Sequence, residues 1–446
     1  MKCFIGLDMG TSAIKGAIVS EDGKVLGTAH GPFEYYNKNG GKLLDTEHFL
    51  NVCYNVIAEL VSKKGDYEVA AICPCCASGN MTLLDKDNKP LIPIIGWQSN
   101  VDAEEAATYY TDEEKLEIYN KVGWRPGRGF TAIWLPYIKK HMPELFAKTK
   151  FICMSAEYLV YSLTGNWGIG HSMGTPFYLM DQEKGVYNKW LLDRLGITEE
   201  MLPPIYDKGT VIGETKAGID GIPERVPVVL GSFDHPSCAT GAGVYEPGEM
   251  LLSCGTSWVE FFPVETRAKA QKAAFLVDRF MLDGAPYCVM TSVASLSIKI
   301  DALREHFLGN ISHKAFDDYA ASAPKGCNGL EFDFTDADFE RGKNFDKGCI
   351  ARAIIESAAK LLSINLEKVK ERGLEAKKIT MVGGITNSDL CVKIVAETLG
   401  MDIAVVNGIN AGAVGAAMLA GIGEGTFKNE KDAFAKMNFE RKVFKH

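Results

Sequence analysis

An acidic residue stands directly before a corner rich in glycine and hydroxyl groups, close to the start of the chain. Asp8 follows the apolar run at residues 4–7, and Gly10, Thr11 and Ser12 come next. Glycine lets the backbone approach a ligand closely, and a row of backbone N–H groups suits phosphate oxygens. A carboxylate here would repel phosphate unless a cation lay between them, and Mg²⁺ prefers such a mixture of carboxylate, water and phosphate. An ordinary hairpin with a capping acid is the alternative interpretation.

The same type of corner occurs again in the middle of the chain. Cys254, Gly255, Thr256 and Ser257 follow the apolar run at residues 249–253, and a further apolar run comes after them. The order strand, Gly-Thr-Ser corner, strand is therefore present twice. Two related halves, each with a phosphate-binding corner, suggest that a nucleotide is held in a cleft between them.

A glycine pair lies near the C-terminus. Gly383 and Gly384 follow the strand-like run at residues 379–382 and precede a helix, for which Ser388 is the expected N-cap and Gly400 the expected end. Glycines at such a corner let a flat ligand approach the backbone. A tight strand-to-helix turn uses the same residues and is the alternative.

The elements that must position the first corner are predicted from periodicity. Short apolar runs bounded by Asp and Gly indicate three antiparallel strands, at about residues 4–9, 13–19 and 25–29. An apolar stripe with helical spacing predicts a helix over residues 46–64, and the run at 69–73 predicts a buried strand.

The cluster Cys73-Pro74-Cys75-Cys76, which begins at the end of this strand, invites a metal-binding interpretation. No second Cys or His pair stands at a spacing typical of zinc sites. We therefore expect these cysteines to act as small buried hydrophobic residues.

Composition excludes several classes of function. The 446 residues are 46% hydrophobic, and 57 acidic against 48 basic residues give a net charge of −9. This is typical of globular proteins of two or three domains, whereas a nucleic-acid-binding protein usually shows a basic surplus. Neither an apolar run long enough for a transmembrane helix nor a signal peptide is apparent. We expect a cytoplasmic protein whose twelve cysteines are reduced, with no nucleic-acid or membrane partner.

Taken in order, these stretches resemble the FGGY family of carbohydrate kinases. The resemblance is carried by the motifs at residues 6–12, 231–234, 253–257 and 382–387, and it extends to residues 159–165 and 351–357. It implies an α/β fold with two ribonuclease-H-like domains, of the actin, hexokinase and Hsp70 type, that enclose a nucleotide cleft. We place the domains at residues 1–244, for sugar binding and catalysis, and 245–446, for nucleotide binding.

The resemblance also implies roles for individual residues. Asp234 matches the catalytic base, which takes the proton of the accepting hydroxyl, and Asp8 matches the acid that positions Mg²⁺. His235 is the rival base in the same loop, and a helix N-cap is the alternative role for Asp234. Contacts to ATP are implied for Thr11, Ser12, Lys15, Gly255, Thr256, Gly383, Gly384 and Asn387.

The sugar-binding loops depart from the family pattern. Thr82 replaces a frequent histidine, Gln98–Val101 replaces a frequent x-Asp-x-Arg, and Thr131 replaces a usual lysine. The substrate is therefore less well predicted than the phosphate machinery. The residues that we expect to contact it are Asn80, Met81, Trp97, Gln98 and Asp234.

The leading hypothesis is an ATP- and Mg²⁺-dependent kinase of a small sugar or polyol, with a ketose such as xylulose as substrate. A homodimer is an open option. Two alternatives remain: an actin- or Hsp70-like ATPase switch with protein partners, and a non-catalytic sugar-binding relative. Sugar-dependent release of ADP discriminates between the kinase and the ATPase.

Overall fold

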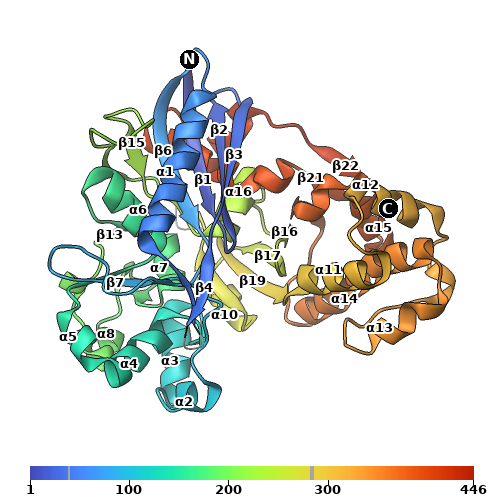
Figure 1. Cartoon of the computed structure of the whole chain (residues 1–446), viewed down its shortest axis with the longest axis horizontal. Coiled ribbons are helices and arrows are strands. Elements are labelled where there is room, and N and C mark those ends of the chain that lie inside the picture. The colour runs from blue at the N-terminus through green and yellow to red at the C-terminus, as the bar shows by residue number, and fades with distance from the viewer. Residues whose placement is uncertain (39–40, 282–285) are drawn as a thin grey trace. The chain divides into compact units, whose positions relative to one another are not determined.

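The computed structural model describes residues 1–38, 41–281 and 286–446 (Figure 1). The chain divides into two compact units. Unit 1 comprises residues 1–241, 276–287 and 412–439, and unit 2 comprises residues 242–275, 288–411 and 440–446. Two segments beyond residue 244 thus belong to unit 1. The units group residues by contact, and the predicted domains at 1–244 and 245–446 stay a prediction.

The central sheet of unit 1 has the strand order β14-β15-β6-β1-β2-β3. Strands β1, β2 and β3 are antiparallel neighbours, β6 and β15 continue the sheet in parallel with β1, and β14 is an antiparallel edge. The predicted opening of three antiparallel strands is confirmed. The bounds are β1 (Lys2–Met9), β2 (Ala13–Ser20), β3 (Val25–Pro32), β6 (Glu68–Cys76), β14 (Val211–Glu214) and β15 (Pro227–Val229).

Shorter strands and several helices complete unit 1. The short strands are β4 (Tyr35–Lys38), β5 (Gly41–Leu44), β7 (Thr82–Leu84), β8 (Ile94–Ile95), β9 (Phe151–Cys153), β10 (Ile169–Gly170), β11 (Met180–Asp181), β12 (Val186–Tyr187), β13 (Ile205–Tyr206) and β18 (Leu276–Arg279). The helices are α1 (Thr46–Ser62), α2 (Ala103–Ala107), α3 (Asp112–Val122), α4 (Thr131–His141), α5 (Pro143–Lys148), α6 (Ser155–Thr164), α7 (His171–Phe177), α8 (Lys189–Leu195), α9 (Asp234–Ala242), α16 (Ala411–Gly423) and α17 (Glu430–Met437).

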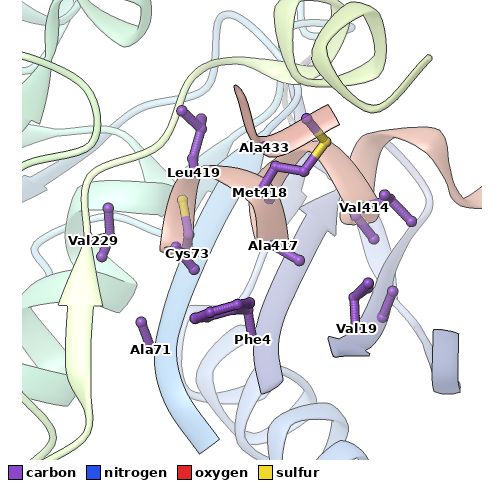
Figure 2. Packing of buried hydrophobic residues seen from close by; sticks show 14 of the residues in the cluster. Phe4, Val19, Ala71, Cys73, Val229, Val414, Ala417, Met418, Leu419 and Ala433 are labelled. Atoms are coloured by element: carbon purple, nitrogen blue, oxygen red, sulfur yellow. The ribbon is translucent and has the colours of Figure 1, made fainter. Parts of the chain in front are cut away.

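Helix α16 covers one face of the unit 1 sheet at very short range. A Cβ atom on Gly6 of β1 would lie 1.8 Å from the carbonyl oxygen of Ala413, so only glycine permits this approach. Apolar side chains from the strands pack against the helix (Figure 2). The strand residues include Phe4, Val19, Ala71, Cys73 and Val229, and the helix residues include Val414, Ala417, Met418 and Leu419.

Helix α1 covers the opposite face. Asp45 caps it by accepting hydrogen bonds from the backbone N–H groups of Glu47 and His48. Its apolar side packs on β2 and β3, where Gly16 and Gly31 leave room for the side chains of the helix. The helix predicted over residues 46–64 is therefore confirmed. Residues of β2 alternate between the two covered faces, as the pleat of a strand requires.

Unit 2 has a comparable sheet, with its strands in the order β19-β17-β16-β20-β21-β22. Strand β16 is antiparallel to β17 and parallel to β20, just as β1 is antiparallel to β2 and parallel to β6. The predicted second strand–corner–strand is confirmed. The strands are β16 (Glu249–Cys254), β17 (Trp258–Val264), β19 (Tyr287–Val293), β20 (Lys378–Gly383), β21 (Ile403–Val405) and β22 (Lys442–Phe444). The helices are α10 (Arg267–Lys272), α11 (Leu296–Leu308), α12 (His313–Ser322), α13 (Asp338–Arg341), α14 (Lys347–Glu371) and α15 (Asp389–Leu399).

Local signals were sufficient for two further features. Ser388 caps α15 by accepting a hydrogen bond from the N–H of Cys391, and Gly400 ends the helix with a positive φ of 64°. Cys73, Cys75 and Cys76 are buried free thiols within β6, as their interpretation as small hydrophobic residues predicted.

A buried ion pair anchors two late segments of the chain in unit 1. The ammonium of Lys208 lies 2.9 Å from Oε1 of Glu430 at the start of α17, and both side chains are almost completely buried. The same ammonium donates to the backbone carbonyl of Phe280, just after β18. The carbonyl of Val277 also accepts a hydrogen bond from the indole of Trp124. Lys208 therefore connects β18 and α17 to the body of unit 1.

We predict that Lys208→Ala destabilises unit 1 by about 3–5 kcal/mol, because the Glu430 carboxylate would remain buried without its cation. Urea unfolding measures the effect. Lys189→Ala is the matched control, because Lys189 and Asp193 form an exposed pair, and it should change the free energy of unfolding by less than about 0.5 kcal/mol. Equal stability of the two variants would contradict the anchoring role.

Candidate active site

Asp8 lies at the end of β1, at the point where helix α16 begins. Phe4, Gly6 and Asp8 occupy alternate positions on the face of β1 that α16 covers. A Cβ atom on Gly412, in the first turn of α16, would lie 2.4 Å from Oδ2 of Asp8. The carboxylate therefore lies against the N-terminal end of a helix, where the helix dipole favours a negative charge.

The surroundings of Asp8 oppose its ionisation. Burial, followed by the negative charge of Asp234, raises the pKa of Asp8 to about 6. Lys15, which pairs with Asp8 in the register of β1 and β2, and His235 act in the opposite direction. A carboxylate with a second negative charge beside it is a favourable place for a cation, which would offset both charges.

Asp234 is the first residue of α9 and follows a tightly packed loop. A Cβ atom on Gly231 would lie 2.1 Å from the carbonyl oxygen of Pro74 in β6, so the loop is pressed against that strand. Oδ1 of Asp234 accepts a hydrogen bond from the backbone N–H of His235 at 2.9 Å. The imidazole Nε2 of His235 lies 3.9 Å from the same oxygen, and both side chains are about one quarter exposed.

Helix α9 is held against α16 by a further close approach. Oγ of Ser237 donates to the carbonyl of Gly412 at 2.8 Å, and a Cβ atom on Gly415 would lie 1.9 Å from the carbonyl oxygen of Ser237. Asp8 at the end of β1 and Asp234 at the start of α9 are thereby brought into one polar region of unit 1.

The Gly10–Ser12 corner contacts the predicted sugar-binding loop that contains Trp97. The indole Nε1 of Trp97 donates to Oγ1 of Thr11 at 2.9 Å, and Ser12 is exposed beside it. Thr11, Trp97 and Asn80 also line a cavity of about 20 Å³. A cavity of this size holds about one water molecule, so it is too small for a sugar.

The other predicted sugar contacts are engaged within the protein. Oδ1 of Asn80 accepts from the N–H of Ser155 at 2.6 Å, and its Nδ2 donates to the carbonyl of Ala77 at 3.0 Å. Asn80 thus fixes its loop to the start of α6. Met81 is buried, and Oε1 of Gln98 accepts from the ammonium of Lys42 at 2.6 Å. Sugar contacts from these residues stay a prediction.

Sequence reasoning missed an aromatic group next to Asp234. The rings of Phe130, Tyr178 and Phe233 lie 5.9, 6.0 and 5.7 Å from the ring of Trp124, each nearly perpendicular to it. Gly79, in the predicted sugar-binding loop that also contains Asn80, packs on Phe130. A Cβ atom on Gly79 would come within 2.2 Å of the Phe130 ring. The available signal was the glycine-rich run at residues 123–129, which includes Trp124.

The predicted nucleotide-binding residues of unit 2 surround a cavity of about 420 Å³, within the usual size range of ligand sites. Its lining includes Gly255, Thr256, Gly384 and Asn387. Gly383 is adjacent: its φ is 101°, and a Cβ atom there would lie 2.3 Å from the carbonyl oxygen of Cys254. The ends of β16 and β20 therefore meet through a position that requires glycine.

The donors present in unit 1 suit magnesium. Mg²⁺ is usually held by one or two carboxylates together with water and substrate phosphates, and Asp8 and Asp234 supply hard oxygen donors beside a phosphate-type corner.

In the part of the chain that the structure describes, no helix is long and apolar enough to span a membrane.

Comparison with known proteins defines the class. The model of the N-terminal domain of the FGGY family of carbohydrate kinases matches residues 3–241, and that of the C-terminal domain matches residues 292–424. The fold and these matches identify a two-domain α/β phosphotransferase. The chain belongs to the FGGY family of carbohydrate kinases, as its motifs predicted.

Individual relatives share about a quarter of the sequence. Xylulose kinase of Bacillus subtilis is 24% identical, with 100% of this chain and 93% of that protein covered. L-xylulose/3-keto-L-gulonate kinase of Escherichia coli is 24% identical over 96% of this chain and 90% of that protein.

Solved structures confirm the fold class. Ligand-bound xylulose kinase from Lactobacillus acidophilus has a TM-score of 0.86 at 22% identity, with 100% of this chain and 94% of that chain covered. Plasmodium falciparum glycerol kinase with ADP has a TM-score of 0.83 at 18% identity, with the same shares covered. The predicted nucleotide cleft between the domains stays a prediction.

Glu157, a buried acid on α6, makes the stability of the protein depend on pH. Burial raises the pKa of Glu157 on α6 from 4.5 to about 8, although the backbone N–H groups of Glu157 and Met154 partly offset this. Between these two values the folded state binds the proton more tightly than the unfolded state. Glu157 therefore stabilises the fold at low pH and loses this effect as the pH rises toward 8.

We predict that Glu157→Gln becomes progressively more stable than the wild type as the pH rises from about 5 to 8, by up to about 1.4 kcal/mol per pH unit. Above pH 8 the difference should level off. Other buried acids cancel in this comparison because both proteins contain them. Thermal unfolding across the pH range measures it, and parallel curves would show that Glu157 does not titrate in this way.

Proposed function

We propose that the protein transfers the γ-phosphoryl group of ATP to a hydroxyl of a small sugar or polyol, with Asp234 as general base. The observation that carries the proposal is the convergence of Asp8 and Asp234 beside the Gly10–Ser12 corner. The nucleotide-sized cavity of unit 2 supports it. A ketose such as xylulose is the first candidate substrate, because relatives along the whole chain are xylulose kinases.

In the proposed reaction the accepting hydroxyl donates a hydrogen bond to the carboxylate of Asp234. Its oxygen attacks the γ-phosphorus, the proton passes to Asp234, and ADP leaves with the electrons of the broken P–O bond. Little covalent help is required, since positioning and charge neutralisation supply most of the rate. When bound, Mg²⁺ would offset the charge of the phosphates, and Asp8 is the residue that would hold it.

The phosphate groups have identifiable partners in this proposal. Thr11, Ser12 and Lys15 lie on or beside the corner that follows β1, and Gly255 and Thr256 form the corresponding corner after β16. The Trp97 indole fixes the Thr11 hydroxyl. A displacement of the loop that contains Trp97 would therefore also displace the hydroxyl of Thr11 in the Gly10–Ser12 corner.

The substrate is found by measuring ADP release with a panel of ketoses, polyols and sugar acids. Release that depends on a panel member supports the kinase and identifies its substrate. Release that no member accelerates would favour the ATPase alternative.

For Asp234 we predict that Asp234→Asn lowers kcat by about 10²–10⁴-fold, the usual contribution of a general base. Nucleotide binding should be retained, because the cavity of unit 2 does not include this residue. His235→Asn is the matched control in the same loop and should have a smaller effect. A folded Asp234→Asn variant with nearly wild-type kcat would refute the role.

For Asp8 we predict that Asp8→Asn raises the magnesium concentration required for half-maximal activity while the KM for sugar changes little. Asparagine preserves the size of the side chain and removes the charge that attracts the cation. A magnesium titration of the sugar-saturated enzyme measures this. An unchanged magnesium requirement would leave Asp8 as a structural residue of the corner only.

A further inference from the structure

Helix α11 lines the cavity of unit 2 over about two turns, from Ser297 to Arg304. At one end Oγ of Ser297 donates to the carbonyl of Gly255 at 2.6 Å, and the N–H of Ser297 donates to the carbonyl of Thr256. Arg304, seven residues further along the same helix, also lines the cavity. At 1.5 Å per residue this separates the two ends by roughly 10 Å, about the reach from the phosphates of a nucleotide to its base.

The far end of the cavity is built for a flat ring with a polar edge. The guanidinium of Arg304 lies over the ring of Phe316, 5.6 Å from its centre, and donates to the carbonyl of Ile311. Apolar side chains line the cavity as a whole, and Ile298, which directly follows Ser297, is 53% exposed although it is large and apolar. The apolar lining includes Ile298, Ile300, Ile355 and Ile385.

Asp317 on α12 presents a fixed carboxylate to this end of the cavity. Its Oδ1 accepts a hydrogen bond from Oγ of Ser388 at 2.8 Å, while Ser388 itself caps α15. The thiol of Cys391 lies 3.9 Å from the same oxygen. Across residues 1–38, 41–281 and 286–446, neither a hydrogen bond nor an ion pair engages the second oxygen, Oδ2. One acceptor is therefore held in place and available to a ligand.

We propose that Oδ2 of Asp317 accepts a hydrogen bond from the exocyclic amine of adenine and thereby selects ATP among nucleoside triphosphates. The proposal rests on the proposed function, because it places the donor nucleotide in this cavity. Hypoxanthine, the base of inosine, and guanine carry a carbonyl oxygen in place of this amine. That oxygen would face the carboxylate without a proton between them. Binding such a base leaves acceptors unpaired or repelled, at a cost of about 1–3 kcal/mol.

Two other partners of Asp317 are less well matched. A carboxylate that binds guanine through its ring N–H and amino group uses both oxygens, whereas Oδ1 is already committed to Ser388. Ribose hydroxyls would lie closer to the phosphates, level with Asp301, which also lines the cavity only four residues after Ser297. The base edge is therefore the group that best fits Oδ2 of Asp317.

The test is equilibrium binding of ADP, IDP, GDP and 2′-deoxy-ADP to the full-length protein without sugar, by calorimetry. We expect the wild type to bind ADP about 5- to 150-fold more tightly than IDP, which is the stated penalty at 1.4 kcal/mol per tenfold. Asp317→Asn should remove this preference or reverse it, because the amide can donate to the carbonyl of hypoxanthine. Asp318→Asn is the matched control: its exposed carboxylate pairs with Lys314 on the same helix, and the preference should persist.

Equal affinity of the wild type for ADP and IDP would overturn the proposal without any variant. An unchanged preference in Asp317→Asn would also overturn it. An Asp317→Asn protein that loses discrimination against 2′-deoxy-ADP but keeps it against IDP would assign the residue to ribose instead. Failure of ADP itself to bind would contradict the proposed function as well, so the two failures are distinguishable.

Discussion

The close approach of helix α16 to strand β1 and helix α9 is the constraint on which the candidate active site depends. It is possible only because Gly6, Gly412 and Gly415 lack side chains, since a Cβ atom at any of them would come within about 2.5 Å of a neighbouring atom. The hydrogen bond from Ser237 to the carbonyl of Gly412 holds helix α9 against helix α16. The helix, the strand and the start of α9 are therefore closely packed together.

This packing has an electrostatic consequence. It places Asp8 and Asp234 so near each other that the negative charge of Asp234 raises the pKa of Asp8. Burial of a carboxylate costs free energy unless a cation or hydrogen-bond donors accompany it, and the charges of Lys15 and His235 supply part of this compensation at Asp8. Stability is maintained by other contacts, such as the buried Lys208–Glu430 pair.

Local chemistry in the sequence was enough to predict part of this arrangement. Short apolar runs bounded by Asp and Gly predicted β1 to β3, and Ser388 and Gly400 marked the ends of α15, because these signals act over a few residues. The repeated Gly-Thr-Ser corner likewise predicted β16 and β17. The family motifs indicated which polar residues and glycines in each half of the chain belong to the candidate site.

Long-range packing could not be predicted in this way. The contact of Gly6 with Ala413 joins the two ends of the chain, and no local pattern announces it. The same holds for β18 and α17, which join unit 1 through Lys208. Neither the hydrogen bond from Ser155 to the amide oxygen of Asn80 nor the aromatic group around Trp124 follows from a local pattern.

The central claim is that the assembly around Asp234 activates a sugar hydroxyl rather than water. Phosphorus-31 NMR of the wild-type protein with ATP, magnesium and the substrate found in the panel tests it most directly, because the product itself is observed. The account predicts a phosphate monoester resonance of the sugar that grows in equal amount with ADP, with little inorganic phosphate. Inorganic phosphate growing with ADP, and no sugar phosphate, would contradict it.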